Sequence, residues 1–537
     1  MPRVLSEEPQ MINAPEPSGQ PGAFAKLSRR DVLKLAGSAA TLAVGAAAIG
    51  VGGRALAGGV VEPLNVKPTP GLLRFRLTAT PAFVQMRPGA MTAVWRFRYR
   101  LLEGDGSYLT PGPGFMGPTI RVPRGTRVIC DYSNNLSEIS NVHWHGLDIP
   151  ADQDGHPKDF VEPGGTRRYD FVVDQPAGTC WYHPHPDMRT GPQVYMGLAG
   201  LFIVTDKEEA KSRLPQRELA LVLQDRQFGA GNGLVYGDPS GVVGMLGNVV
   251  QVNGEQLPTL ALAAGPVRLR LLNASNSRIY KLALSDGTPL TVVGTDNAVL
   301  PTAVNRGYLM LSPGERADVW LDLSARANSE VLTLRSLSFN PFMMGSSSLV
   351  NGAAFDVCRF QTSTAPTTPA AAPGALVPFE AYTLAGASNA ANPRLYPIGR
   401  DTTTNPDLCQ PCWTLNGVLY TLTGLESNET VPADTLEVLQ VDNPANGPVM
   451  PHPIHFHGRA FQVLSRARVT GNSSTQTSYN GVKDGFVDSG WKDTVLVWPG
   501  ERVQVLMKWT THRGLFVYHC HNLEHEDMGM MRNLLVV

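Results

Sequence analysis

The sequence predicts an all-β chain of three related β-sandwich domains, and three observations support this fold class. First, 54 Gly and 43 Pro are spread along the 537 residues, which suits many short strands joined by turns. Second, residues 74–100 alternate apolar and polar side chains, as half-buried strands do. Third, one order of strand and turn motifs recurs three times along the chain, which indicates internal duplication.

Length and composition are those of an ordinary globular protein. A chain of 537 residues suggests three or four domains. The apolar content of 42% and the charged content of 17% are unremarkable in such a protein. The formal net charge of −1 gives no indication of nucleic acid or of another strongly charged partner. The six Cys are too few to form a disulfide scaffold.

The first repeat shows the motif order. A strand–turn–strand pattern at 118–128 leads to His-Trp-His at 143–145. A second strand pair then begins near residue 161 and ends at His-Pro-His, residues 183–185. The first repeat thus offers two His-x-His segments, and the last repeat offers two more. If these two repeats face each other with pseudo-twofold symmetry, the eight His converge on one interface.

The last repeat follows the same order, and the middle repeat follows it without histidines. Near the C-terminus, His-Phe-His and His-Cys-His end the two strand pairs, at 455–457 and 519–521. In the middle, residues 268–274 and 311–316 match the two strand pairs, but no His follows either one. The predicted domains are residues 60–207, 208–362 and 378–537, with a Thr-, Ala- and Pro-rich linker at 363–377.

Residues 1–57 predict an export signal that follows a polar, disordered N-terminus. The motif is Ser28-Arg29-Arg30-Asp31-Val32-Leu33-Lys34, which resembles the twin-arginine motif with Val32 where Phe is usual. An apolar stretch and a small-x-small cleavage site, Ala55-Leu56-Ala57, follow it. A retained membrane anchor is the alternative, because about 19 residues just suffice to span a bilayer. Export by the twin-arginine machinery would place the mature protein in the periplasm or outside a bacterial cell.

Ten of the 12 histidines fall in four clusters. These are His143-Trp144-His145, His183-Pro184-His185, His452-Pro453-Ile454-His455-Phe456-His457, and the terminal group of His519, His521 and His525. One His-x-His pair is usually a solvated or core pair, but clusters that hold nearly all of the histidines indicate metal ligands. Only His156 and His512 lie outside the clusters, and we expect both at the surface.

The last twenty residues contain a second type of ligand set. Cys520 lies between His519 and His521, and His525 and Met530 follow five and ten residues later. Cys, two His and a weak axial Met are the ligands of a mononuclear blue-copper site, so one further His must come from elsewhere. Because side chains alternate along an extended strand, His519 and His521 point away from Cys520 toward a second centre. Residues 519–521 would then form a short covalent path for electrons.

These motifs resemble those of the multicopper oxidases, over about residues 65–537 and in the family's order and spacing. The most similar members are laccase-like and bacterial: copper-efflux cuprous oxidases and spore-coat laccases, together with bilirubin oxidase. The resemblance is strengthened by Trp181-Tyr182-His183-Pro184-His185, Met196-Gly197-Leu198-Ala199-Gly200-Leu201 and Gly490-Trp491-Lys492-Asp493-Thr494. It implies cupredoxin-like Greek-key sandwich or barrel domains, four copper ions, O2 as the electron acceptor, and a monomer, since both halves of the cluster lie in one chain.

The resemblance also implies how the ligands divide among one type 1, one type 2 and two type 3 coppers. The expected type 1 ligands are His452, Cys520, His525 and Met530. The expected type 2 ligands are His143 and His455. One type 3 copper would take His145, His183 and His519, and the other His185, His457 and His521. A thioether at the axial position predicts a lower potential than an apolar residue there would give.

Two carboxylates are candidate catalytic residues, because the reduction of O2 to water needs a supply of protons. Asp154 matches the acid that the family places beside the type 2 copper, and Glu526 matches the acid near the type 3 pair. We expect both to relay protons; for each, the alternative is an ordinary surface carboxylate.

The reductant is less clearly indicated. The 16 Met are scattered, whereas cuprous oxidases of the family usually carry a Met-rich segment over the type 1 site. Met450 matches a substrate-side Met of that group, but Pro448 stands where an acid is expected. We therefore expect an open type 1 site that oxidises phenols or aromatic amines, with electrons entering at the ring edge of His452. The candidate wall residues are Phe339, Phe342 and Met343.

Several other functions stay open. A periplasmic cuprous oxidase for copper tolerance would use Cu(I) as its reductant. A relative without turnover would serve as a copper-binding, storage or structural protein. A two-domain nitrite reductase fits less well, because such a chain lacks the full set of four motifs.

The remaining cysteines are expected to be structural. Cys409 and Cys412 form a Cys-x-x-Cys motif without the following His of a haem site, so a surface disulfide or two free thiols are expected. Cys130, Cys180 and Cys358 are expected to be buried small hydrophobes, and a Cys130–Cys180 pair is possible.

Overall fold

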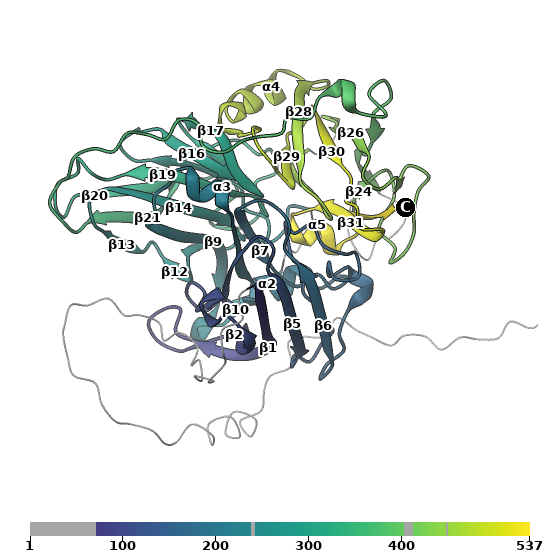
Figure 1. The fold of residues 1–537 in the computed structure, drawn as a ribbon. Coiled ribbons are helices and arrows are strands. Elements are labelled where there is room, and N and C mark those ends of the chain that lie inside the picture. The colour runs from purple at the N-terminus through teal and green to yellow at the C-terminus, as the bar shows by residue number, and fades with distance from the viewer. Residues whose placement is uncertain (1–70, 238–241, 402–411, 447–448) are drawn as a thin grey trace, which may run out of the picture. The chain divides into compact units, whose positions relative to one another are not determined.

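Strands dominate the described chain (Figure 1). They pair into sheets within three consecutive stretches of sequence: the first at residues 72–205, the second or middle one at 218–362, and the third at 394–536. The computed structural model describes residues 71–237, 242–401, 412–446 and 449–537. Residues 1–57, for which an export signal is predicted, lie outside the described residues. Among the described residues, no helix is long and apolar enough to cross a membrane.

The first stretch forms two four-stranded sheets, in the orders β2-β1-β5-β6 and β3-β4-β8-β7. Their strands are β1 (Leu72–Val84), β2 (Thr92–Gly104), β3 (Leu109–Thr110), β4 (Thr119–Pro123), β5 (Arg127–Asn134), β6 (Thr166–Val172), β7 (Gly178–Tyr182) and β8 (Gly200–Thr205). Side chains alternate along β1, so Leu73, Phe75 and Leu77 are buried and Arg76 is exposed. β1 pairs in parallel with β5, and β4 with β8, so strands distant in sequence become neighbours, as in a Greek key.

The second stretch forms an eight-stranded and a five-stranded sheet around one core. The first sheet contains β9 (Glu218–Phe228), β10 (Leu234–Val235), β11 (Val249–Val252), β12 (Glu255–Gln256), β14 (Pro266–Asn273), β16 (Leu290–Thr295), β17 (Ala298–Arg306) and β19 (Arg316–Asp322). The second contains β13 (Thr259–Leu262), β15 (Tyr280–Leu284), β18 (Leu309–Leu311), β20 (Val331–Ser336) and β21 (Phe355–Thr362). Residues 374–376, near the end of the predicted linker, hydrogen-bond to β17. This part of the linker therefore lies along the edge strand of the sheet.

The third stretch holds a four-stranded, a five-stranded and a two-stranded sheet. Their strands are β22 (Arg394–Leu395), β23 (Ile398–Asp401), β24 (Cys412–Leu415), β25 (Thr430–Val431), β26 (Leu436–Asn443), β27 (His452–Phe456), β28 (Phe461–Arg468), β29 (Thr494–Val497), β30 (Glu501–Lys508), β31 (Gly514–Cys520) and β32 (Met531–Val536). β31 lies between β32 and β27 in the five-stranded sheet, so the His-Cys-His motif ends an interior strand of that sheet. All three stretches therefore confirm the predicted all-β fold class.

Short helices connect the strands, and one of them carries site residues. They are α2 (Thr190–Met196), α3 (Lys207–Lys211), α4 (Ser473–Asn480) and α5 (Leu523–Asp527). Asp527 of α5 accepts hydrogen bonds from the backbone N–H groups of Thr190 and Gly191, at the start of α2. α5 is thereby fixed to the first stretch directly after the terminal His-Cys-His motif.

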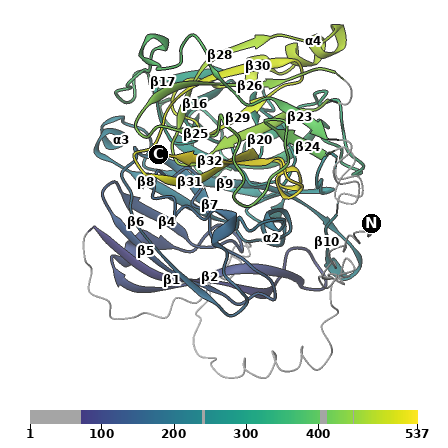
Figure 2. The same cartoon turned by 90° about the vertical axis from the view of Figure 1, so that its right-hand side faces the viewer.

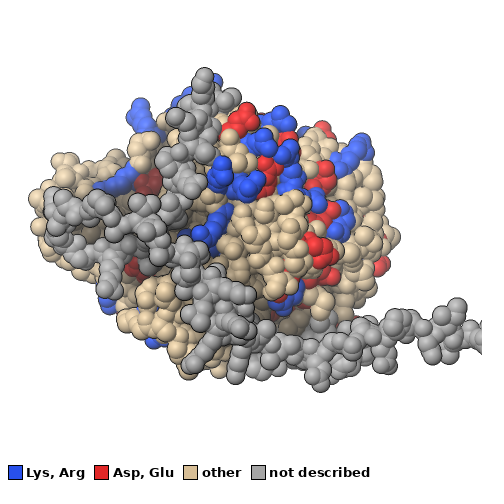
Figure 3. Space-filling view, turned by 90° about the horizontal axis from the view of Figure 1, so that it is seen from below, with Lys and Arg blue, Asp and Glu red and all other residues tan. Residues whose placement is uncertain are grey.

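Charged side chains of both signs are interspersed on the face that Figure 3 shows. A mixed surface agrees with the net charge of −1 and creates no large field of one sign on that face.

Figure 2 views the ribbon from the side, with the strands of the third stretch above those of the first.

The core of the second stretch gives a stability prediction. Val319 on β19 is fully buried in that core, whereas Val331 on β20 is 46% exposed. Val319→Ala should lower the free energy of unfolding by about 2 kcal/mol, because it removes two buried methyl groups and leaves a cavity. Val331→Ala is the matched control and should change it by less than about 0.5 kcal/mol. Chemical unfolding of the metal-free protein measures both, and equal losses would contradict the packing described here.

Candidate metal centre

Eight imidazoles converge where the first and third stretches meet. Three groups have donor atoms within 4.8 Å of one another: His145, His183 and His521; His185, His457 and His519; and His143, His145 and His455. All eight rings are buried. The structure thus brings together the four His-x-His motifs that the sequence singled out.

Strand pairing and ring stacking hold the imidazoles in place. β27 and β31 pair antiparallel with His455 opposite His519, and His143 bridges to His183. Across the junction, the ring centroids of His143 and His457 lie 3.8 Å apart, as do those of His145 and His455. Each His-x-His segment of one stretch therefore faces a segment of the other, as the repeat predicted.

The expected division of the imidazoles needs one correction. His519 groups with His185 and His457, and His521 groups with His145 and His183, so the two residues exchange places relative to the prediction. The cause is the antiparallel pairing of β27 with β31. Moving from His455 to His457 along one strand leads away from His521 on the other, so His457 lies nearer to His519.

Hydrogen bonds define which ring nitrogen is free in three of these imidazoles. The Nδ1 atoms of His143, His183 and His455 lie 2.7–2.8 Å from the backbone carbonyls of Asp154, Pro184 and Asp493. A carbonyl only accepts, so each Nδ1 must carry the proton and each Nε2 keeps its lone pair. Among the described residues, these three buried Nε2 atoms have no hydrogen-bond partner.

These free nitrogens fit bound metal ions. A buried polar atom without a partner costs folding free energy, so such atoms are rare unless something binds them. The Nε2 atom of His519 lies 3.2 Å from that of His185 and 3.1 Å from that of His457, a convergence of donors that a shared cation would satisfy. Burial lowers the pKa of His183 and of His455 to about 3, which keeps them in the neutral form that ligates metals.

A second group surrounds the thiol of Cys520. Its Sγ atom lies 3.6 Å from Nδ1 of His452 and 3.6 Å from Nδ1 of His525. His525 Nε2–H donates to the carbonyl of Val242 at 2.9 Å, so the nitrogen that faces the thiol is Nδ1. Met530 is buried beside them, and its backbone carbonyl accepts a hydrogen bond from the N–H of Cys520. Burial raises the pKa of the Cys520 thiol, so binding of a metal there must release a proton.

Comparison with known proteins decides the family. Two sequence profiles described as multicopper oxidase match residues 101–209 and 396–537. The multicopper oxidase mco of Staphylococcus aureus is 30% identical over 426 residues, which are 78% of this chain and 82% of that protein. The chain belongs to the multicopper oxidase family.

Two further similarities extend along most of this multicopper oxidase. A crystal structure of the multi-copper oxidase from Pediococcus acidilactici is 30% identical, with a TM-score of 0.71, and the match covers 90% of this chain and 93% of that one. The cell division protein FtsP of Escherichia coli is 31% identical over 535 residues, which are 95% of this chain and 99% of that protein. The family therefore includes relatives named for an oxidase and relatives named for cell division.

Access to Cys520 in this multicopper oxidase differs from the expectation of an open site. His452 is fully buried, and the ring of Trp413 lies 4.6 Å from it and 5.8 Å from that of His525. Trp413 Nε1–H donates to the same Val242 carbonyl as His525, which fixes the indole against both rings. The ring edge of His452 is therefore covered, and a reductant must act through the residues around it.

Two of the three candidate wall residues, Met343 and Phe339, pack against different core clusters. Met343 packs against the core cluster that contains Cys520, Met450 and Met530. Phe339 instead packs against Trp498 in a separate cluster. The sequence missed Trp413, because its position next to the Cys-x-x-Cys motif carried no signal for a role beside copper ligands.

Both candidate proton-relay carboxylates contact the imidazole cluster. Oδ2 of Asp154 lies 2.6 Å from Nδ1 of His457, and its backbone carbonyl holds His143. Burial raises the pKa of the Asp154 carboxyl well above its usual value. Glu526 lies 3.0 Å from Nδ1 of His519 and 3.4 Å from Nδ1 of His185. Neither residue is a surface carboxylate, since both are buried.

The residues outside the clusters show one correction. His156, expected at the surface, is fully buried: its Nε2 bonds to Asn533 at 2.9 Å and its Nδ1 accepts from the N–H of Lys158. His512 is half-buried. Cys130, Cys180 and Cys358 are buried free thiols, so the possible Cys130–Cys180 disulfide is absent. Cys412 is in a disulfide bond, and Cys409 lies outside the described residues.

The two groups of donors predict copper contents that a single substitution separates. Cys520→Ser should remove one copper ion per chain from the loaded protein and abolish its blue colour, while the copper at the eight imidazoles remains. Cys358→Ser is the matched control, since Cys358 is also a buried free thiol but lies in the core of the second stretch. Metal analysis measures both, and loss of all copper in Cys520→Ser would contradict two separate sites.

The burial of His156 predicts a pH dependence of stability. Burial lowers its pKa from 6.5 to about 4. The unfolded chain therefore takes up the proton first, so the contribution of His156 is complete above pH 6.5 and is lost as pH falls to 4, by about 3 kcal/mol. In the metal-free protein, wild type should lose more stability than His156→Gln over that interval, measured by chemical unfolding at each pH. Parallel losses would rule out the buried, neutral His156.

Proposed function

We propose that this chain is a laccase-like copper oxidase with O2 as the electron acceptor. It takes electrons one at a time from a small phenolic or aromatic amine reductant at the Cys520 group. Four electrons and four protons then reduce one O2 to two waters at the eight imidazoles. The observation that carries this proposal is that Cys520 belongs to the thiol group, whereas its neighbours His519 and His521 belong to two groups of imidazoles.

Residues 519–521 provide the path between the groups. β31 is extended up to Cys520, so the side chains of His519 and Cys520 point to opposite sides of the strand. His521, directly after the strand, groups with His145 and His183. An electron at Cys520 therefore reaches either group of imidazoles through one covalent neighbour and its backbone.

The donor sets fit four coppers, one at the Cys520 group and three among the imidazoles. Bound copper would supply one-electron redox chemistry at the thiolate and the binding of O2 among the imidazoles. At the Cys520 group, His452, His525 and Met530 complete the set that a blue-copper site requires. Trp413 excludes water from this group by covering both imidazole rings.

Protons reach the imidazoles through Asp154 and Glu526 in this proposal. Oδ1 of Asp154 has no hydrogen-bond partner among the described residues, so it can hold a proton while Oδ2 accepts from His457. Glu526 lies beside His185 and His519. The two carboxylates thus contact all three imidazoles of the group His185, His457 and His519, where general acids can deliver protons to a reacting group.

A surface groove and a small inner cavity lie next to each other at the imidazoles. A surface groove of about 820 Å³ is lined by Gly146, Asn297 and Arg459, among others. A small cavity that reaches His143, His455 and His457 shares these three lining residues. These three residues therefore separate the groove from the imidazoles, and we propose that O2 and water enter past them.

A second candidate function is oxidation of Cu(I), and one observation favours it. Met450 is buried, and Met343 packs against the cluster that holds it together with Cys520 and Met530. Soft thioethers are the ligands that Cu(I) prefers. The covered His452 also fits a small ion better than a bulky phenol.

A structural function without turnover is the third candidate, since FtsP relatives are named for cell division. The complete set of ten clustered imidazoles, the thiol and the thioether argues against it.

We also propose export by the twin-arginine machinery to the periplasm or beyond, on the motif at residues 28–34. The chain would act as a monomer.

Oxygen uptake by the copper-loaded protein tests these alternatives. We expect one O2 to be consumed per four molecules of a methoxyphenol oxidised by one electron each, without added Cu(II). Cys520→Ser should abolish this uptake, and Cys358→Ser should retain it. Uptake with Cu(I), and with the phenol only after Cu(II) is added, would favour the cuprous oxidase and reject the phenol oxidase. Copper binding without any uptake would leave a storage or structural protein.

A further inference from the structure

The middle stretch supplies no imidazole, yet one of its turns contacts the cluster. The motif Ser312-Pro313-Gly314-Glu315-Arg316 repeats the turn that leads to histidines elsewhere in the chain. A Cβ atom at Gly314, where φ is +84°, would lie 2.7 Å from the ring of His521. The turn therefore packs directly against a candidate ligand, and only glycine fits there.

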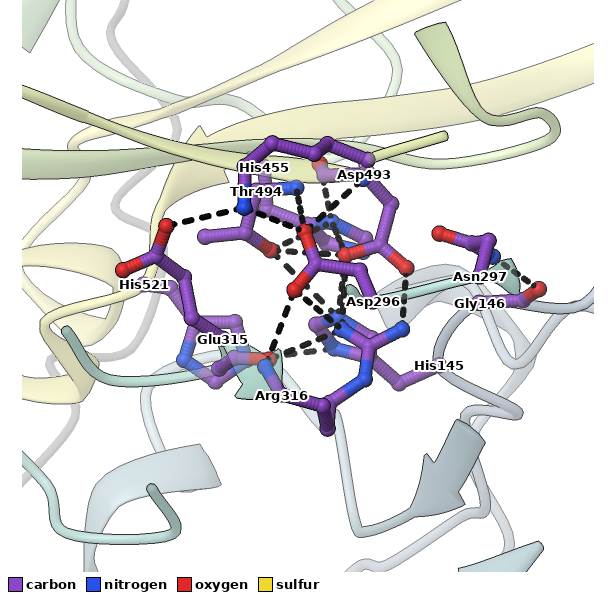
Figure 4. Close-up of polar contacts among 12 residues, drawn as sticks. His145, Gly146, Asp296, Asn297, Glu315, Arg316, His455, Asp493, Thr494 and His521 are labelled. Carbon is purple, nitrogen blue, oxygen red and sulfur yellow. Dashed lines mark hydrogen bonds and ion pairs between the residues drawn. The ribbon is translucent and has the colours of Figure 1, made fainter. Parts of the chain in front are cut away.

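Arg316, at the end of this turn, is a buried junction of all three stretches. Its Nη1 and Nη2 donate to Oδ1 and Oδ2 of Asp493, at 2.7 and 2.5 Å (Figure 4). Its Nε donates to the carbonyl of Thr179 on β7 at 2.8 Å. A bidentate pair of this kind fixes the plane of the carboxylate as well as its position.

Asp493 in turn orients two imidazoles. Its Oδ1 atom lies 3.0 Å from Nε2 of His145, and its backbone carbonyl accepts from Nδ1 of His455. His145 is thereby oriented oppositely to His455: its Nε2 faces the carboxylate and its Nδ1 faces Nε2 of His521, at 3.3 Å. A carboxylate on the outer nitrogen of a ligating His sets the tautomer and the ring orientation.

Arg316 is the cationic partner of Asp493, because the neighbouring Lys492 pairs with other carboxylates. Lys492 pairs with Asp296 and Glu315, each at 3.1 Å. Within the described part of the chain, Arg316 is the one Arg or Lys paired with Asp493. Without it, a buried carboxylate beside the cluster would lose its compensating charge.

We propose that Arg316 is a positioning residue of the imidazole cluster, acting through Asp493 to fix the orientation and tautomer of His145 and the place of His455. The proposal rests on the proposed function, because it concerns the imidazoles as copper ligands. The middle stretch, which has no histidines, then contributes to the imidazole cluster through this arginine.

The test is retention of copper by the loaded protein against a competing chelator. Arg316→Gln should release copper from the imidazoles at 10–100-fold lower chelator concentration than wild type, the usual effect of removing such a partner. The blue absorption of the Cys520 site should be unchanged. Arg316→Lys, which keeps the charge but loses the bidentate geometry, should lie between the two.

A matched control separates positioning from general loss of stability. Arg278 is also fully buried in the middle stretch, and it binds one carboxylate, Asp225 at 2.8 Å, and backbone carbonyls. Arg278→Gln should therefore destabilise the fold but retain imidazole-bound copper within about twofold of wild type. Total copper by metal analysis, less the thiolate-bound copper given by the blue absorption, measures the imidazole-bound copper in each variant.

The outcomes are distinguishable from failure of the proposed function. If wild type holds no copper at the imidazoles, the proposed function fails. If wild type does, but Arg316→Gln retains it equally, or loses no more of it than Arg278→Gln, the positioning role is overturned. If Arg316→Gln does not fold, Asp493→Asn tests the same contact from the other side, and unaltered copper retention there would also overturn it.

Discussion

The structure depends on the burial of free imidazole nitrogens at the junction of the first and third stretches. In His143, His183 and His455, a backbone carbonyl holds one ring nitrogen, and the other has no partner among the described residues. Buried nitrogen lone pairs that converge without donors are unfavourable in a fold of protein atoms alone. They become favourable when cations share them, so metal binding and the closure of this junction are coupled.

The three stretches have different tasks in this arrangement, although they share one fold. The first and third supply the imidazoles, and the third adds the thiol that connects them to a second group. The middle stretch contributes what surrounds the ligands: the Gly314–Arg316 turn at the cluster and the Val242 carbonyl at His525. Short α5 joins these contributions, because Glu524 accepts hydrogen bonds from Ser277 and Met245 of the middle stretch while Asp527 holds α2 of the first.

The sequence singled out the histidines that the structure brings together, because His-x-His spacing on strands is a local pattern with period two. It also predicted the fold class, since alternation and recurring turns are local. It did not predict which of His519 and His521 joins His457, because that depends on the antiparallel register of β27 with β31. Nor did it predict Arg316 or the burial of His156, whose partners Asp493 and Asn533 are 177 and 377 residues away. Contacts between residues so far apart produce no periodic pattern in the sequence.

The proposed function requires one copper at Cys520 and three among the eight imidazoles. Anomalous X-ray scattering at the copper edge, from crystals of the loaded protein, tests it most directly. The account predicts four peaks in the anomalous map, one between Cys520, His452 and His525 and three among the imidazoles. A single peak at Cys520, or none at either group, would contradict it.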